Sequence, residues 1–314
     1  MATTIPQRAV IREVGLRDGL QSIRTILPTE RKKEWIRAAY DAGLRELEVG
    51  SFVPARLLPQ LADTAEIVDF ARTLPSLLFR SSYQTCERRG RHRQWRRLDD
   101  CAFVCKPRSQ PCEPEKDTRR GSNRSRTHSR RTGCLWFEDH YRGGVGTAFG
   151  CTIQGEVNPA EVLRLMEALL DVGADRVCLA DTVGYADPLM VMDLFERARA
   201  IAGDKLWCGH FHDTRGLGLA NVFAALQTGI TRFDACLTGI GGCPHAPGAS
   251  GNVAGEDLAY MLESMGIETG VDISALLALR EKISAWLAGE IMHGTLWKAG
   301  LPKTFGTTQV TAAA

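Results

Sequence analysis

Residues 160–184 read AEVLRLMEALLDVGADRVCLADTVG, and this stretch decides the fold. Apolar residues recur every three or four positions as far as the turn at 172–175, which is typical of an amphipathic helix, and a short apolar run then ends in polar residues. The same order of helix, glycine turn and strand returns at 29–52, 189–216 and 217–243. This repeated order predicts consecutive parallel βα units.

An open doubly wound sheet would carry a glycine-rich phosphate turn after its first strand, and IREVGLRDG at 11–19 holds none. Polar residues instead end several different strands, as at the carboxyl-terminal face of a barrel. We therefore predict an α/β protein, a (β/α)8 TIM barrel with extra C-terminal helices at 256–267 and 273–292. We expect residues 1–300 to form a single barrel domain and 301–314 to form a flexible tail.

The composition is that of an ordinary soluble protein, with 44% hydrophobic residues, 24% charged residues and a net charge of +2. No apolar run approaches the roughly 18 residues of a membrane span, and the first residues show no apolar signal core. The ten cysteines lack paired metal-ligand spacing. We expect a cytoplasmic protein that binds no membrane.

The segment 80–142 interrupts the βα pattern. It carries 15 Arg and 2 Lys against 8 acidic residues, a net charge of +9, whereas the rest of the chain sums to −7. Three interpretations are open: a disordered basic arm for nucleic acid, a genuine insertion, or an out-of-frame stretch of a GC-rich gene. We favour the last, because the pattern stops near Phe79 and resumes near Gly144. Such a stretch cannot supply barrel strands 3 and 4, so we expect that region to be disrupted.

Candidate metal ligands lie at the ends of strands. His210 and His212 stand two residues apart, so on a strand their side chains face the same way. A hydrogen-bonded pair of core histidines is the alternative interpretation. Asp18 offers a carboxylate oxygen and Asn252 an amide oxygen. Two nitrogens and two oxygens, with open positions for substrate, favour six-coordinate Mg²⁺ or Mn²⁺.

Other polar residues lie at comparable places in the pattern. Arg17 stands beside a candidate ligand, where it would hold a carbonyl oxygen that gains negative charge, or would form a surface ion pair. Glu48 and Asp181 end two further strands, where they would orient ligands or move protons, or serve as solvated caps. The loop GGCPHAPGASGN at 241–252 places Cys243 among small residues that let the backbone approach a ligand.

Four stretches resemble the hydroxymethylglutaryl-CoA lyase family, which are metal-dependent lyases built on the (β/α)8 barrel: EVGLRDGLQ, LEVGSFVPARLLPQLADTAEIV, CGHFHDTRGLGLAN and GIGGCPHAPGASGNVAGEDLAYMLE. The similarity covers roughly 1–78 and 144–300, and the cysteine loop is its most specific part. The resemblance implies a divalent metal cation (Mg²⁺ or Mn²⁺) on Asp18, His210, His212 and Asn252, catalytic roles for Arg17, Glu48, Asp181, His210 and Cys243, and substrate contacts from Arg17 and Gln21.

The reaction implied by the resemblance is the retro-Claisen cleavage of 3-hydroxy-3-methylglutaryl-CoA to acetyl-CoA and acetoacetate, as in leucine and ketone-body catabolism. A base takes the proton of the C3 hydroxyl, Arg17 stabilises the enolate, and the thiol of Cys243 supplies or relays a proton. We expect an acyl-CoA partner, no nucleic acid, and a homodimer or a higher homo-oligomer.

Two alternatives stay open. The chain could cleave a related 3-hydroxyacyl-CoA such as citramalyl-CoA, because one methyl or methylene group in a pocket is worth only about 1–3 kcal/mol. It could also be a catalytically impaired chain with a non-catalytic basic segment. A condensing synthase of the isopropylmalate or homocitrate kind is disfavoured by the cysteine loop.

Overall fold

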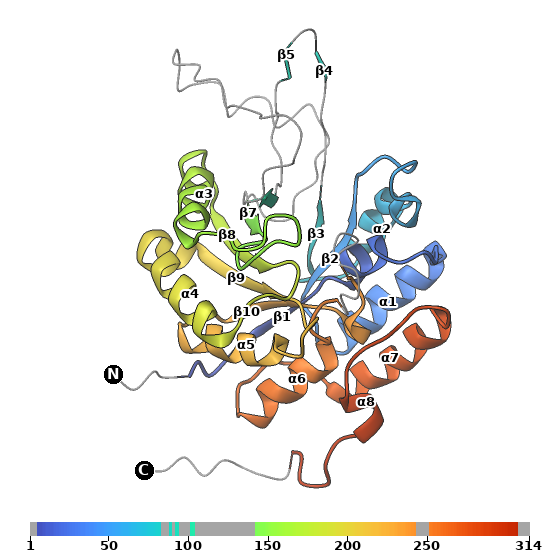
Figure 1. Cartoon of the computed structure of the whole chain (residues 1–314). Coiled ribbons are helices and arrows are strands. Elements are labelled where there is room, and N and C mark those ends of the chain that lie inside the picture. Colours follow the sequence, from blue (N-terminus) through green and yellow to red (C-terminus); the bar gives the residue numbers. More distant parts are fainter. Residues whose placement is uncertain are drawn as a thin grey trace.

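The computed structural model, shown in Figure 1, describes the following parts of the chain: residues 5–82, 88–89, 92–93, 101–103, 142–242 and 251–306. Within these residues helices and strands alternate, as the repeated pattern predicts. Among the described residues, none of the helices combines the length and the apolar character that a membrane crossing requires.

One parallel sheet organises the protein. Its strands are β1 (Val10–Glu13), β2 (Glu46–Ser51), β3 (Leu78–Ser82), β6 (Cys101–Phe103), β7 (Arg142–Gly146), β8 (Arg176–Asp181), β9 (Leu206–Phe211) and β10 (Arg232–Ala235). They lie in the order β3-β2-β1-β10-β9-β8-β7-β6. A separate antiparallel pair consists of β4 (Arg88–Arg89) and β5 (His92–Arg93).

The strand order is that of a (β/α)8 barrel. The first strand, β1, pairs in parallel with both the second, β2, and the last, β10, which is how a barrel closes. The remaining neighbours in the sheet are also neighbours along the chain. In the described parts of the chain no ladder joins β3 to β6. The predicted parallel α/β architecture is confirmed.

Short strands do occur inside the segment 80–142. β3 ends within it at Ser82, and β6 pairs in parallel with β7 through Cys101–Phe103. The expectation that this segment supplies no barrel strand is therefore wrong for these residues. The three residues of β6 need only main-chain partners to join a parallel ladder, and β7 provides them. The rest of the segment lies outside the described residues, so the out-of-frame interpretation stays a prediction.

Helices surround the sheet in Figure 1. They are α1 (Thr29–Asp41), α2 (Thr64–Ala71), α3 (Pro159–Asp171), α4 (Pro188–Ala202), α5 (Gly218–Gln227), α6 (Gly255–Ser264), α7 (Ile273–Trp286) and α8 (Leu296–Ala299). Their starts follow from local chemistry. The Asn158 side chain accepts from the Ala160 N–H at the start of α3, and Asp187 caps α4 in the same way. The predicted C-terminal helices are α6 and α7.

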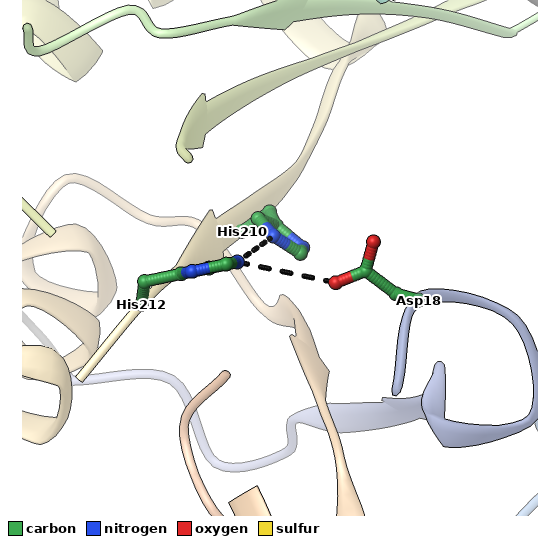
Figure 2. Close-up of side chains that lie close together, drawn as sticks. All are labelled: Asp18, His210 and His212. Atoms are coloured by element: carbon green, nitrogen blue, oxygen red, sulfur yellow. Dashed lines mark hydrogen bonds and ion pairs between the residues drawn. The ribbon is translucent and has the colours of Figure 1, made fainter. Parts of the chain in front are cut away.

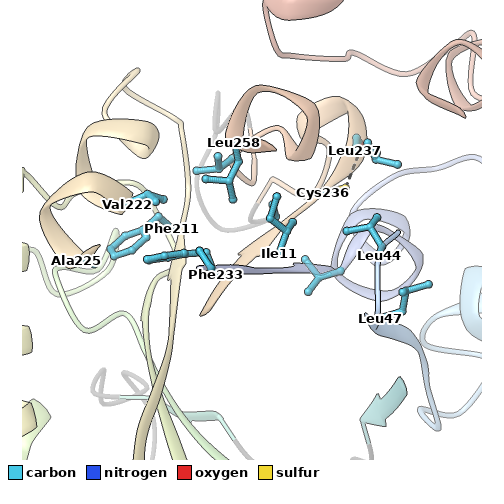
Figure 3. Close-up of a cluster of buried hydrophobic side chains, with 14 of the residues drawn as sticks. Ile11, Leu44, Leu47, Phe211, Val222, Ala225, Phe233, Cys236, Leu237 and Leu258 are labelled. Atoms are coloured by element: carbon cyan, nitrogen blue, oxygen red, sulfur yellow. Dashed lines mark hydrogen bonds between the residues drawn. The ribbon is translucent and has the colours of Figure 1, made fainter. Parts of the chain in front are cut away.

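The core lies between the sheet and these helices. Figure 3 shows Ile11 of β1 and Phe233 of β10 beside Val222 of α5 and Leu258 of α6. Side chains alternate along a strand, so the neighbours of Ile11 and Phe233 in sequence face the other side of the sheet. The apolar side chains on one face of these strands thus pack against the helices, and the other face is available to polar side chains.

The start of the expected tail packs on the domain. Leu301 and Phe305 contact the core, and the Phe305 ring lies 5.4 Å from that of Tyr260 of α6. Residues 307–314 lie outside the described residues. The division into a barrel domain over 1–300 and a flexible tail stays a prediction.

Candidate active site

Arg17 and Asp18 stand on a single π-helical turn, η1 (Gly15–Gly19), directly after β1. Turns of this kind are rare and are frequent at functional sites. A Cβ atom at position 15 would collide with the Glu13 carboxylate and the Trp35 ring, so only glycine fits there. The missing Cβ at position 15 therefore lets this turn pack closely against Glu13 and Trp35.

The carboxylate of Asp18 is held from two sides. Its Oδ1 atom accepts from Arg17 Nη1 at 3.0 Å and from Gln21 Nε2 at 2.8 Å. Its Oδ2 atom accepts from Asn252 Nδ2 at 2.7 Å and lies 3.9 Å from His212 Nε2. Four residues named by the sequence motifs thus converge on this carboxylate.

His210 and His212 point toward one another and toward Asp18, as Figure 2 shows. His210 lies on β9 and His212 follows that strand, and their Nε2 atoms are 3.1 Å apart. One ligand atom from each of Asp18, His210 and His212 falls within 4.8 Å of the others. Burial would raise the pKa of Asp18, but His210, Arg17 and His212 hold it below its usual value.

Asp234, which belongs to no recognisable sequence motif, orients His210. Its Oδ2 atom lies 3.2 Å from His210 Nδ1, so the Nε2 atom is left to face His212. Burial lowers the pKa of His210, but the hydrogen bond and charge of Asp234 outweigh it and raise the pKa to about 9. Burial and the neighbouring His210 lower the pKa of His212 to about 3, which keeps that ring neutral. A carboxylate behind a ligating histidine is a common arrangement at metal centres.

Asn252 completes the predicted ligand set. A short antiparallel bridge joins it to His212, and its Nδ2 atom also donates to the Ile240 carbonyl at 3.1 Å. Its Oδ1 atom is buried and accepts no hydrogen bond within the described residues. A buried amide oxygen left in this way is suited to a cation. The oxygens of Asp18 and Asn252 and the two imidazoles fit Mg²⁺ or Mn²⁺.

Arg17 and Glu48 form the next layer of the site. Arg17 Nε lies 3.4 Å from Glu48 Oε1, and the arginine side chain keeps 21% of its surface exposed. Glu48 is buried near the end of β2. The guanidinium is thus held between the carboxylates of Glu48 and Asp18, with part of its surface open to a substrate.

The carboxylate of Asp181 binds backbone N–H groups of the loop after β8. This residue ends β8, and its two carboxylate oxygens accept from the backbone N–H groups of Tyr185 at 2.8 Å and Ala186 at 3.1 Å. Burial raises its pKa to about 6 against these hydrogen bonds and the charge of His210. The structure therefore places Asp181 near the site but uses its carboxylate to shape the loop after β8.

The loop that carries Cys243 is described only at its two ends. Residues 243–250, including Cys243, lie outside the described residues. At the far end, Gly251 has φ +115°, and its carbonyl accepts from the Asp213 N–H at 2.8 Å. The ends of the loop thus sit beside Asn252 and the strand end that bears the histidines.

Known proteins resemble this chain in sequence and in fold. The family model HMGL-like matches residues 123–283. The chain is 35% identical over 293 residues to the mitochondrial hydroxymethylglutaryl-CoA lyase of Arabidopsis thaliana, covering 90% of this chain and spanning 60% of that protein's length. It is also 35% identical over 308 residues to the (R)-citramalyl-CoA lyase of Chloroflexus aurantiacus, covering 94% of this chain and 95% of that protein.

A solved structure matches over nearly the whole chain. It is an HMG-CoA lyase from Acinetobacter baumannii in complex with coenzyme A and 3-methylmalate, with a TM-score of 0.77 and 30% sequence identity. The match covers 95% of this chain and 96% of that chain.

Proposed function

The chain belongs to the HMGL-like family of carbon–carbon lyases, and from this premise we propose that it cleaves 3-hydroxy-3-methylglutaryl-CoA to acetyl-CoA and acetoacetate with a divalent cation. The observation that carries the proposal is the meeting of Asp18, His210 and His212 within 4.8 Å, beside the buried Asn252 Oδ1 atom. These four residues would hold Mg²⁺ or Mn²⁺. When bound, such a cation polarises substrate oxygens and lowers the pKa of a hydroxyl group.

Arg17 is proposed to bind the oxygen that becomes negative as the C2–C3 bond breaks. Its guanidinium is fixed by Glu48 and Asp18 before substrate arrives, so little reorganisation is needed when charge develops. Gln21, which donates to Asp18, would keep that carboxylate turned toward the histidines and contact the substrate.

Two proton movements complete the proposed reaction. The C3 hydroxyl loses its proton to a base, the C3–O bond becomes the ketone of acetoacetate, and the C2–C3 electron pair becomes the enolate of acetyl-CoA. A proton delivered to that carbon gives the acetyl methyl group. We assign the carboxylates Glu48 and Asp181 to the first movement, with His210 acting through the cation that it would hold, and the Cys243 thiol to the second.

The citramalyl-CoA alternative is kept because the Chloroflexus aurantiacus enzyme matches 94% of this chain. The deciding experiment compares kcat/KM for the two CoA thioesters, each with Mg²⁺ and with excess chelator. Cleavage of hydroxymethylglutaryl-CoA that is preferred and chelator-sensitive is expected. Preference for citramalyl-CoA would replace the substrate, and full activity in chelator would reject the metal assignment. The expected cytoplasmic location and homo-oligomeric state stay predictions.

A further inference from the structure

A row of charged side chains crosses four neighbouring strands and ends at the candidate metal site. The ladder pairs Glu46 of β2 with Arg12 of β1, Arg12 with Asp234 of β10, and Asp234 with His210 of β9. Residues in register on adjacent strands project from the same face of a sheet. The four therefore lie side by side, and carboxylates alternate with nitrogen donors along the row.

The contacts along the row are specific to single atoms. Arg12 Nη1 lies 2.7 Å from Asp234 Oδ1, and Arg12 Nε lies 3.5 Å from Glu46 Oε2. The other oxygen of Asp234, Oδ2, lies 3.2 Å from His210 Nδ1. Arg12 and Glu46 are 5% and 6% exposed, so water competes little for these bonds. Each oxygen of Asp234 thus has its own nitrogen partner.

We propose that Asp234, oriented by Arg12, is a positioning residue that keeps Nδ1–H of His210 directed at Asp234, so that Nε2 is the nitrogen left to coordinate the metal. The inference rests on the proposed function, because it takes His210 as a metal ligand. Arginine has only donors, so Arg12 always claims an acceptor oxygen from its partner. The remaining oxygen of Asp234 can then only accept, which determines where the imidazole hydrogen lies.

A second metal site at the same place is excluded by charge. The Cys178, Cys208 and Asp234 side chains also lie within 4.8 Å of one another. However, Arg12 Nη1 lies 3.2 Å from Cys208 Sγ as well as 2.7 Å from Asp234 Oδ1. A permanent cation therefore already occupies the position that a metal would take. The carboxylate of Asp234 serves His210 rather than a second ion.

Asp234→Asn tests the assignment. Arg12 will claim the amide oxygen, which turns the amide NH₂ group toward His210 Nδ1. That nitrogen must then accept, and the imidazole hydrogen moves to Nε2, where it blocks the ligand position. We expect Mn²⁺ to bind about 10- to 100-fold more weakly, as is typical when the partner of a ligating histidine is lost. Free Mn²⁺ is measured by electron paramagnetic resonance on the purified full chain, without reference to turnover.

Two further variants distinguish the effect of side-chain orientation at position 234 from the effect of losing a buried negative charge. Glu46→Gln deletes a carboxylate on the other side of Arg12 and touches no histidine, so Mn²⁺ affinity should stay at the wild-type value. In the double variant Arg12→Met, Asp234→Asn no arginine claims the amide oxygen. The amide can rotate to accept from His210 Nδ1–H, and Mn²⁺ affinity should recover relative to Asp234→Asn alone. This variant also removes one buried charge of each sign, so it stays measurable if the single variant does not fold.

The outcomes distinguish failure of the metal assignment from failure of the role proposed for Asp234. Wild-type protein that binds no Mn²⁺ would reject both the metal assignment and the inference. Wild-type protein that binds Mn²⁺ while Asp234→Asn binds it equally well would reject only the inference. Equal weakening in the single and double variants would also overturn it, because Arg12 would then have no part in orienting position 234.

Discussion

Two buried polar clusters in this protein differ in whether their atoms have partners. At the strand ends, the cluster of Asp18, His210, His212 and Asn252 leaves the Asn252 Oδ1 atom buried without a donor among the described residues. Behind the barrel, Glu256 of α6 pairs with Arg280 of α7, and both are at most 2% exposed. We call these the strand-end cluster and the helix cluster.

The charged groups of the helix cluster are satisfied by the protein itself. The carboxylate of Glu256 accepts from Arg280 Nε and from the Thr238 N–H at 3.2 Å, and Arg280 Nη2 donates to the His293 carbonyl. Such an arrangement holds segments together but offers no atom to a ligand. Burial of charge therefore does not by itself mark a site. The distinguishing features are ligand atoms that converge and a buried oxygen that lacks a donor.

The largest expected effect comes from breaking the helix cluster. Arg280→Met leaves the Glu256 carboxylate buried without its cation, and loss of one partner of a buried pair costs about 3–5 kcal/mol. The free energy of unfolding, measured by urea titration, should fall by about that amount. Mn²⁺ affinity of the folded fraction should not change. A variant with wild-type stability would show that this pair contributes little to the fold.

His212→Ala should disrupt the strand-end cluster, with a loss of activity and metal binding but little change in stability. Removal of a ligand forfeits several kcal/mol of charge stabilisation, which is about 1,000-fold in turnover since each tenfold step is about 1.4 kcal/mol. Mn²⁺ binding should weaken in parallel, whereas the urea midpoint should stay close to the wild type. Asp193→Asn, on the exposed face of α4, is the matched control for an unrelated side-chain change. Retained turnover in His212→Ala would exclude this residue from the metal site.

Cys243→Ser tests whether the loop at 241–252 adds a proton-transfer group to the strand-end cluster. If the thiol delivers a proton, turnover should fall at least about 100-fold, in the range for loss of a proton-transfer group. KM should change far less, because the thiol acts on the developing carbanion rather than on the bound substrate. Steady-state kinetics with saturating Mg²⁺ gives both numbers. Turnover within a few-fold of the parent would make Cys243 a packing residue.

At Glu13 we expect a change in the pH dependence of stability. Its carboxylate accepts from the Gly15 and Leu237 N–H groups, and burial raises its pKa from 4.5 to about 8. The folded state therefore binds this proton more tightly than the unfolded state, so stability falls as pH rises from about 4.5 to 8 and stays at the lower value above that. Glu13→Gln should show a shallower fall over this window in urea titrations at several pH values. An identical pH profile for both proteins would mean that Glu13 has an ordinary pKa when folded.

Much of the candidate site could be predicted from local sequence. The strand-end positions of Asp18 and of the His210–His212 pair follow from the βα repeat and the two-residue period of a strand. Asp234 could not be found in this way, because a single acid in RFDAC carries no motif. Only the position of β10 between β9 and β1 gives that carboxylate its partners.

By itself the sequence determined the alternation of helices and strands and the residues at the carboxyl ends of the strands, because these depend on periodicity within short windows. The tertiary structure alone decided which polar atoms have partners. In it the Asp181 carboxylate accepts from the loop after β8, Asp234 contacts His210, and Asn252 Oδ1 has no donor among the described residues. The physical reason is that a hydrogen bond depends on distances of about 3 Å between strands far apart in the chain, which no local pattern encodes.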